Sequence, residues 1–154
     1  MKILVLNAGS SSQKSCLYEL NDVLPDRPLQ PLWSAQIDWT HQQGIAELKV
    51  KTAKGDRLEE EIASDSRKAA ISRMLETLWR EKTQVINDLN EIDIVGHRVV
   101  HGGQDYQQST LISLDVKKAI ARLSVFAPVH NPVNLEGIEI IENILPNVPQ
   151  IAVF

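Results

Sequence analysis

The feature that most constrains this chain is its beginning, where two apolar segments flank a run of small polar residues. Residues 2–6 (KILVL) form a compact apolar run after Lys2, which is typical of a buried strand. The run NAGSSS at residues 7–12 stops that strand, and residues 13–20 (QKSCLYEL) form a second candidate strand. Two strands joined by a short loop that contains glycine predict a β-hairpin.

Further candidate strands follow the hairpin, and three candidate helices lie among them. The strand-like segments are residues 32–38, 45–50, 92–100 and 151–154. Apolar residues at helical spacing predict helices over residues 65–82, from Ser113 or Asp115 to Leu123, and over residues 131–145. Ser64 is the expected N-cap of the first helix, with Asp65 in its first turn, and Pro132 marks the start of the third. Antiparallel strands followed by alternating helices and strands predict an α/β fold.

Size and composition narrow the possible classes of function. The 154 residues correspond to about one domain, and 16 basic against 20 acidic residues give a net charge of −4. This balance, together with only 5% aromatic residues, argues against nucleic-acid binding, which needs a cationic or base-stacking surface. No apolar stretch approaches the length of a membrane span, and the single Cys16 cannot form an internal disulfide. We therefore expect a cytoplasmic protein with no nucleic-acid or membrane partner.

The polar loop of the hairpin is the first candidate for chemistry. The segment from Asn7 to Lys14 (NAGSSSQK) combines backbone amides, the hydroxyls of Ser10 and Ser12, and one ammonium group. These are the groups that bind phosphate oxygens. The segment lacks the GxxxxGK[ST] spacing of a Walker A loop, and a strand rather than a helix follows it. A polar hairpin turn without a ligand is the alternative, and composition alone favours neither.

The second candidate is the segment VGHRVVHGG at residues 95–103. Arg98 lies in a strongly apolar strand, and arginine is rarely buried unless it is paired. Its valine neighbours and the following glycine pair favour anion binding over the alternative, an edge strand with Arg98 in solvent or in a structural ion pair. His97 and His101 share one face of the strand. Because no third metal ligand is in view, packing or hydrogen bonding is a better interpretation of this pair than a metal site.

The third candidate is the segment APVHNP at residues 127–132, where His130 immediately precedes the predicted start of a helix. A helix N-terminus favours anions and disfavours a charged imidazole ring. Two interpretations follow, a neutral histidine beside a bound phosphate or a histidine that caps the helix. The motif alone does not separate them.

Taken together, the three segments resemble the acetate kinase family, within the acetate and propionate kinase group. The matching residues are NAGSSSQK at 7–14, VGHRVVHGG at 95–103 and APVHNPVNLEGI at 127–138, in the order and spacing of the family. The resemblance implies the N-terminal domain of the acetate and sugar kinase/actin-like (ribonuclease H-like) superfamily, in which two domains of similar fold surround a nucleotide. It also implies reversible, ATP- and Mg-dependent phosphorylation of acetate to acetyl phosphate.

The same resemblance assigns roles to residues on the nucleotide side. Asn7 matches a position of the metal site, which holds Mg²⁺ (or Mn²⁺) directly or through water. Ser10, Ser12 and Lys14 match positions of the phosphate loop, and Lys14 is the expected contact to ATP.

Four other residues match the acetate side. Arg98 matches the arginine that binds the carboxylate and the transferring phosphoryl group, and His130 matches a histidine that contacts phosphoryl oxygens. Val100 and Val129 match the small pocket for the acetate methyl group, although the family often carries leucine in place of Val129. Because acetate is already an anion, the main chemical task is to neutralise and orient two negatively charged reactants.

The resemblance covers residues 1–154, which is well under half of the family's longer chain. It implies an N-terminal acetate kinase domain that is incomplete at its C-terminal end, with the second domain absent. The family places its catalytic aspartate directly after the position of Phe154, so we expect this chain to be inactive alone. The family is usually dimeric, which implies a homodimer for the full-length enzyme. The alternatives are a propionate kinase and a non-catalytic binding module that has lost its catalytic half.

Overall fold

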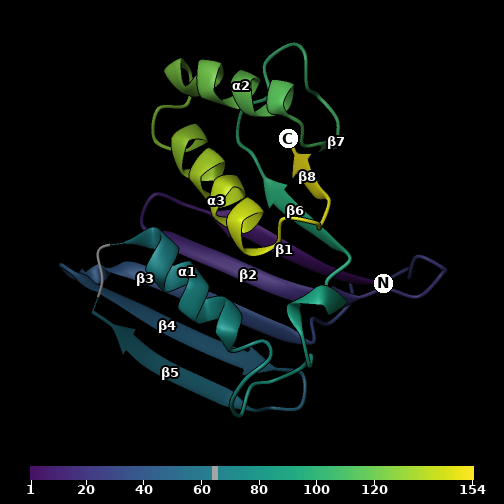
Figure 1. Cartoon of the computed structure of the whole chain (residues 1–154), viewed down its shortest axis with the longest axis vertical. Coiled ribbons are helices and arrows are strands. Elements are labelled where there is room, and N and C mark those ends of the chain that lie inside the picture. Colours follow the sequence, from purple (N-terminus) through teal and green to yellow (C-terminus); the bar gives the residue numbers. More distant parts are fainter. Residues whose placement is uncertain (64–65) are drawn as a thin grey trace.

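The structure, a computed structural model, describes residues 1–63 and 66–154 and contains one mixed sheet with helices packed on it (Figure 1). The strands are β1 (Lys2–Ala8), β2 (Ser12–Glu19), β3 (Trp33–Gln42), β4 (Ile45–Thr52), β5 (Arg57–Ile62), β6 (Ile94–Arg98), β7 (Thr110–Leu111) and β8 (Gln150–Val153). The helices are α1 (Arg67–Glu76), α2 (Leu114–Arg122) and α3 (Asn131–Ile144), with 3₁₀ turns η1 (Leu89–Glu91) and η2 (Leu123–Val125). Within these described residues, no helix has the length and apolar character needed to cross a membrane.

The strand order places several strand ends side by side. The order across the sheet is β5-β4-β3-β2-β1-β6-β8-β7. Strands β1 to β5 form an antiparallel meander, which confirms the predicted β1–β2 hairpin. Strand β6 runs parallel to β1 and β8 runs parallel to β6, whereas β7 is antiparallel to β8. The last residues of β1, β6 and β8 therefore meet at one end of the sheet, called here the carboxyl end, where β2 also begins.

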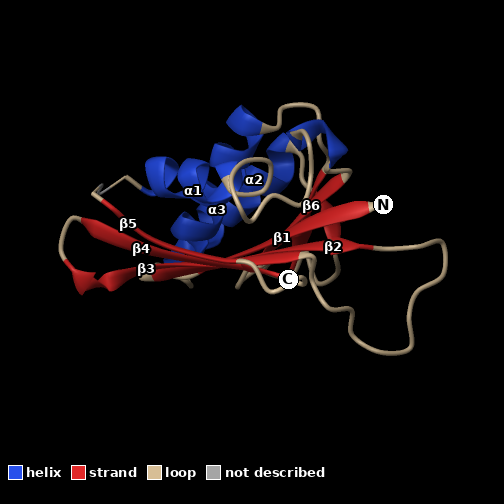
Figure 2. Cartoon of the chain, turned by 90° about the horizontal axis from the view of Figure 1, so that it is seen from below, coloured by secondary structure: helices blue, strands red, loops and turns tan. Residues whose placement is uncertain are grey.

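The helices in the described part of the chain lie on one face of the sheet (Figure 2). Strand alternation directs Leu4 and Leu6 of β1 into the core beneath these helices, where they are buried. The helices contribute the other half of this core, mainly Ala70, Ile71, Met74 and Leu75 of α1 and Ile140 and Ile141 of α3. The opposite side of the sheet is called here the helix-free face. Residues 24–29 of the loop after β2 line a cavity of about 490 Å³ with Ile3, Val5 and Tyr18 of this face.

The first helix differs most from its prediction. It is α1, which ends at Glu76, and residues 77–82 form turns instead of the predicted last helical turns. Leu78 is nevertheless fully buried, so the apolar spacing continues past the point where the helix ends. The predicted N-cap Ser64 and the neighbouring Asp65 lie outside the described residues. Ser66 caps α1, because its side chain accepts a hydrogen bond from the amide of Ala69 at 3.3 Å.

The other predicted elements are confirmed with bounds shifted by a few residues. The second predicted helix is α2, and Ser113 rather than Asp115 is its N-cap, because its side chain accepts from the amide of Val116 at 3.3 Å. Two strands, β5 and β7, have no counterpart among the predicted elements. Strand β5 carries Glu59, Glu60 and Glu61, and glutamate is depleted in strands. Its conformation follows from pairing with β4 over six register positions.

Candidate functional site

Three adjacent strands bring Asn7, Lys14 and Arg98 together at the carboxyl end of the sheet. Asn7 of β1 is the register partner of Lys14 of β2. Leu6 is the register partner of His97, so Arg98 follows directly on the other side of β1. Leu6 and His97 are buried under the helices, so the residues after them point to the helix-free face. Residues far apart in the sequence therefore share one face and one end of the sheet.

These three polar side chains have no protein partners in the described part of the chain. Asn7, Lys14 and Arg98 are exposed, and among residues 1–63 and 66–154 none of their side chains makes a hydrogen bond or an ion pair. Strand β6 lies between β1 and β8, so the edge-strand interpretation of Arg98 is wrong, although the side chain does face solvent. The structural ion pair considered for Arg98 is also absent from the described part of the chain. These cations are thus available to an external anion.

The loop between β1 and β2 turns its carbonyl oxygens toward protein donors. The guanidinium of Arg67 donates to the carbonyl oxygens of both Gly9 and Ser10 at 2.7 Å. The amide of Trp39 donates to the oxygen of Ser11 at 3.0 Å, and the amide of Gly9 donates to the oxygen of Ser12 at 2.7 Å. A Cβ on Gly9 would lie 3.1 Å from that last oxygen, so a side chain there would crowd the turn.

Two amides of the same loop, unlike its carbonyl oxygens, lack a hydrogen-bond partner in the described residues. No acceptor for the N–H groups of Ser10 and Ser11 is present in the described residues, and both side chains are exposed. Successive unpaired amides next to hydroxyl groups form a common type of anion site. The loop therefore has the arrangement of donors expected for phosphate oxygens.

Two buried asparagines in the first turns of α3 hold the strand ends in place. Asn131 accepts from the amide of His101 at 3.2 Å and donates to the carbonyl oxygen of the same residue at 3.1 Å. Asn134 accepts from the amide of Val100 at 3.2 Å and donates to the carbonyl oxygen of Ala8 at 3.2 Å. No sequence motif indicates this role for either asparagine, because the strand-end groups that they bind lie 30 or more positions away.

Asn131 and Asn134 are called here the asparagine clamp. The other predicted site residues lie next to the clamp or next to the groups that it binds. Val100 and Val129 are 45% and 53% exposed, so the chain as described provides apolar surface for a methyl group rather than a closed pocket. His130 occupies the N-cap position of α3, but its side chain makes no capping hydrogen bond. The capping interpretation of His130 is therefore wrong. His130 is exposed and directly precedes Asn131, which binds the backbone of His101 just after β6.

The two histidines of the VGHRVVHGG segment are structural. Nε2 of His97 lies 2.5 Å from Oε1 of Gln150, and burial lowers the pKa of His97 to about 4, against a smaller opposing effect of that hydrogen bond. The ring of His101 accepts from the amide of Gly103 at 3.0 Å and stacks on Phe126 with ring centroids 5.8 Å apart. No cluster of three metal-ligating residues occurs in the part of the chain that the structure describes. Packing and hydrogen bonding are confirmed as the roles of this pair.

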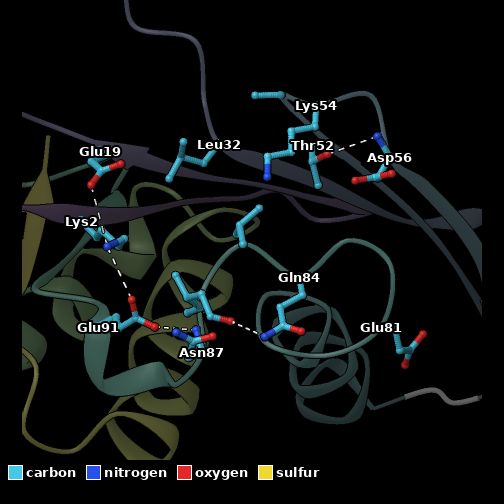
Figure 3. Close-up of a pocket in the computed structure, with 13 residues that line it drawn as sticks. Lys2, Glu19, Leu32, Thr52, Lys54, Asp56, Glu81, Gln84, Asn87 and Glu91 are labelled. Carbon is cyan, nitrogen blue, oxygen red and sulfur yellow. Dashed lines mark hydrogen bonds and ion pairs between the residues drawn. The ribbon is translucent and has the colours of Figure 1, made fainter.

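A large cavity lies at the other end of the same strands (Figure 3). It has a volume of about 680 Å³ and is lined by residues of several turns together with Lys2 and Glu19. Lys2 and Glu19 are register partners at the beginning of β1 and the end of β2, so this cavity and the Asn7–Lys14 pair occupy opposite ends of the hairpin. Of its two lysines, Lys2 and Lys54, the first is neutralised, because Nζ of Lys2 lies 3.6 Å from Glu91 and 3.9 Å from Glu19.

Sequence comparison relates the whole chain to one group of proteins. The family model described as the acetokinase family matches residues 2–154. An acetate kinase of Cyanothece sp. is 61% identical over 154 residues, and an acetate kinase of Nostoc sp. is 58% identical over 155 residues. Each match covers 100% of this chain and 38% of the relative, so the chain spans about two fifths of the length of these curated relatives.

Solved structures give the same result. The crystal structure of Porphyromonas gingivalis acetate kinase is similar with a TM-score of 0.87 and 34% identity, over 99% of this chain and 37% of that protein. A propionate kinase from Francisella tularensis is similar with a TM-score of 0.80 and 32% identity, over 99% and 36% of the two chains. These likenesses confirm the predicted α/β fold of the acetate and sugar kinase/actin-like superfamily. The chain therefore belongs to the acetokinase family.

Proposed function

We propose that this chain is the N-terminal domain of a kinase that transfers a phosphoryl group reversibly between ATP and acetate. One observation carries the proposal: the carboxyl end of the sheet holds cationic and polar side chains without protein partners among the described residues, namely Asn7, Lys14, Arg98 and His130. A reaction between a carboxylate and a polyphosphate has to overcome their mutual repulsion, and fixed positive groups do this. Membership of the acetokinase family supports phosphoryl transfer as the chemistry of this site.

On the nucleotide side, the loop between β1 and β2 binds phosphate oxygens in this proposal. The unpaired amides of Ser10 and Ser11 and the hydroxyls of Ser10 and Ser12 donate hydrogen bonds to them. Lys14, whose register partner is Asn7, adds a full positive charge next to the loop. The observed hydrogen bonds of the loop support this role, because its carbonyl oxygens are directed toward protein donors and away from an anion.

On the acetate side, Arg98 binds the carboxylate and the transferring phosphoryl group. A guanidinium offers two parallel N–H donors to a planar anion, so it orients acetate as well as neutralising it. His130 contacts phosphoryl oxygens from the start of α3, and the exposed surfaces of Val100 and Val129 contact the methyl group. Acetate needs no general base to become a nucleophile, which is consistent with a site made of charges and donors.

The proposed metal contact is Asn7. Its side-chain amide oxygen is a hard ligand without a protein partner in the described residues, which fits Mg²⁺ or Mn²⁺. One oxygen suffices from this chain, because Mg²⁺ usually keeps several waters and takes further ligands from substrate phosphates. When bound, the ion would neutralise phosphate charge. Asn7 would orient the ion relative to Lys14 on the neighbouring strand.

Propionate is a second candidate substrate, because one of the similar solved structures is a propionate kinase. The two acids differ by one methylene group, which is worth about 1–3 kcal/mol in an apolar pocket, or roughly 10- to 200-fold in rate. Val100 and Val129 are the residues of this chain that would contact the extra carbon. Competition between acetate and propionate in the full-length enzyme distinguishes the two substrates.

The test of the proposal compares the full-length protein with residues 1–154 alone. Both are assayed for ATP-dependent acetyl phosphate formation by hydroxamate trapping, with Mg²⁺ present. We expect turnover from the full-length protein and less than about a hundredth of that rate from residues 1–154, since orientation by a second domain is worth roughly 7–11 kcal/mol of barrier. A full-length protein that binds ATP but phosphorylates neither acid would instead be a non-catalytic binding module. Homodimerisation of the full-length protein remains a prediction, which sedimentation would test.

A further inference from the structure

We propose that Arg67 is a positioning residue for ATP, which holds the β1–β2 loop in the conformation that presents its amides to the polyphosphate. The inference rests on the proposed function, because it assigns the loop to the nucleotide. Arg67 is the first residue of α1 and lies 58 positions from Gly9 in the sequence. None of the three motifs that point to the function includes it.

The contacts of Arg67 are directed at the loop backbone rather than at a carboxylate. One terminal nitrogen, Nη2, donates to the carbonyl oxygens of Gly9 and Ser10, both at 2.7 Å. The other, Nη1, is shielded from solvent and has no hydrogen-bond acceptor among the residues that the structure describes. No carboxylate of the described residues forms an ion pair with this guanidinium. Its charge is therefore not neutralised by direct contact, and it lies directly behind the loop.

Trp39 forms a platform that fixes the guanidinium. The Cζ atom of Arg67 lies 4.5 Å from the centre of the Trp39 ring, in a cation–π contact. The backbone amide of the same tryptophan donates to the oxygen of Ser11 at 3.0 Å. Burial lowers the pKa of Arg67, and the negative charge of Glu136 on α3 opposes that shift. Arg67 and Trp39 together bind the carbonyl oxygens of three consecutive loop residues.

This arrangement has a direct electrostatic consequence for an anion in front of the loop. A carbonyl oxygen that turned outward would repel phosphate, whereas an amide attracts it. Arg67 holds two oxygens inward and leaves the N–H groups of Ser10 and Ser11 without acceptors in the described residues. A planar guanidinium can reach both oxygens while stacked on the indole ring, and the ammonium group of lysine cannot reproduce that stacking.

The experiment uses Arg67→Gln and Arg67→Lys in the full-length protein, with Arg73→Gln as the matched control. Arg73 lies on the same helix, but in the described chain its guanidinium forms ion pairs with Glu60, Glu76 and Glu81 instead of binding loop carbonyl oxygens. We expect Arg67→Gln to raise the KM for ATP by about tenfold or more, the loss typical of hydrogen bonds to a charged group, and to change the KM for acetate much less. Arg67→Lys should fall between Arg67→Gln and the wild type, and Arg73→Gln should leave both KM values unchanged.

Amide hydrogen exchange supplies a readout that does not depend on activity. In Arg67→Gln the amides of Gly9 and Trp39, which donate to loop oxygens, should exchange about tenfold faster, while amides of β4 keep their wild-type rates. Unchanged exchange at Gly9 and Trp39, or faster exchange with an unchanged KM for ATP, would overturn the positioning role. A wild-type protein without phosphoryl transfer would overturn the proposed function instead, and the exchange data would still decide whether Arg67 holds the loop.

Discussion

Both ends of the β1–β2 hairpin carry a lysine, but only one of these lysines forms ion pairs within the described chain. At one end Lys2 lies between the carboxylates of Glu19 and Glu91, as Figure 3 shows. At the other end Lys14 on β2 and Arg98 on β6, which flank β1, have no counter-ion among residues 1–63 and 66–154. Both ends belong to the same strands, so the strands themselves do not explain the difference.

The difference between the paired and the unpaired cations indicates where a ligand would bind. A chain with 20 acidic and 16 basic residues has enough carboxylates to pair every cation, and it does pair Lys2, Arg73 and Lys117. Lys14 and Arg98 differ from the other exposed cations because they lie at the same sheet end as a loop whose amides also have no acceptor in the described chain. Cations and loop amides that lack partners at the same place therefore identify this site better than cavity size, since the cavity of about 680 Å³ lies at the end where Lys2 is paired.

The largest expected effect comes from removing the unpaired cation on β6. Arg98→Ala in the full-length protein should lower kcat for acetate by a few hundredfold, because a lost charge contact in the transition state costs about 3–4 kcal/mol. Its unfolding free energy should change by less than about 0.5 kcal/mol, because the side chain is exposed and unpaired. Arg57→Ala is the control, an exposed arginine on β5 of the same sheet. Near-normal turnover in Arg98→Ala would remove Arg98 from the site.

His97, the residue before Arg98, should affect stability rather than turnover, and this effect should depend on pH. The pKa of the buried His97 is lowered to about 4 in the fold, from 6.5 in the unfolded chain. Between these values the unfolded state binds the extra proton, so the unfolding free energy falls as the pH falls from 6.5 toward 4, by about 3 kcal/mol. Denaturant unfolding at several pH values should show this loss in the wild type and a shallower one in His97→Gln. Equal pH dependence of both proteins would contradict the assignment.

A smaller loss of stability is expected from a substitution in the asparagine clamp, which holds the carboxyl end of the sheet together. Asn134→Ala leaves the amide of Val100 and the carbonyl oxygen of Ala8 without their partner. We expect the unfolding free energy to fall by about 1–2 kcal/mol, because two partly buried backbone groups lose their hydrogen-bond partner. Asn143→Ala, an exposed position on the same helix, provides the comparison in the same denaturant titration. If both variants lose equal stability, the clamp has no special role.

The smallest effect should come from the paired end. Lys2→Gln removes two ion pairs with N–O separations of 3.6 and 3.9 Å, both at the protein surface. Such pairs contribute little, so thermal denaturation should show a shift in Tm of no more than about 2 °C. Kinetic constants of the full-length protein should stay at wild-type values. A large loss of activity would mean that this end of the hairpin takes part in function.

Much of the fold can be predicted from local sequence, and its exceptions have physical causes. The strands with apolar runs or clear alternation, such as β1 and β2, are identified within two residues of their bounds. Strand β5 is missed because its three glutamates contradict strand propensity and only pairing with β4 makes it a strand. The first helix is predicted too long because Leu78 keeps helical spacing and no glycine or proline marks the end at Glu76.

The site also contains residues that the sequence predicts and residues that it does not. Asn7, Lys14 and Arg98 lie in recognisable motifs, so the sequence alone predicts them as site residues. Arg67 and Asn134 support the site through contacts with backbone groups 58 and 126 positions away, at Gly9 and Ala8. A backbone carbonyl is present at every residue, so no sequence pattern marks which one a distant side chain will bind. Supporting residues of this kind become visible only in the folded structure.

The parallel pairing of β6 with β1 also determines the order in which the site is assembled. Asn7 and Lys14 are joined by a short turn, whereas the backbone amide of Lys2 binds Asp93 across 91 positions. Closing the longer loop costs about 2 kcal/mol more in chain entropy than closing a seven-residue one. Local contacts form faster than distant ones, so the hairpin with its phosphate loop should be present while Arg98 is still mobile. A nascent chain would therefore possess the half of the site assigned to ATP before the half assigned to acetate.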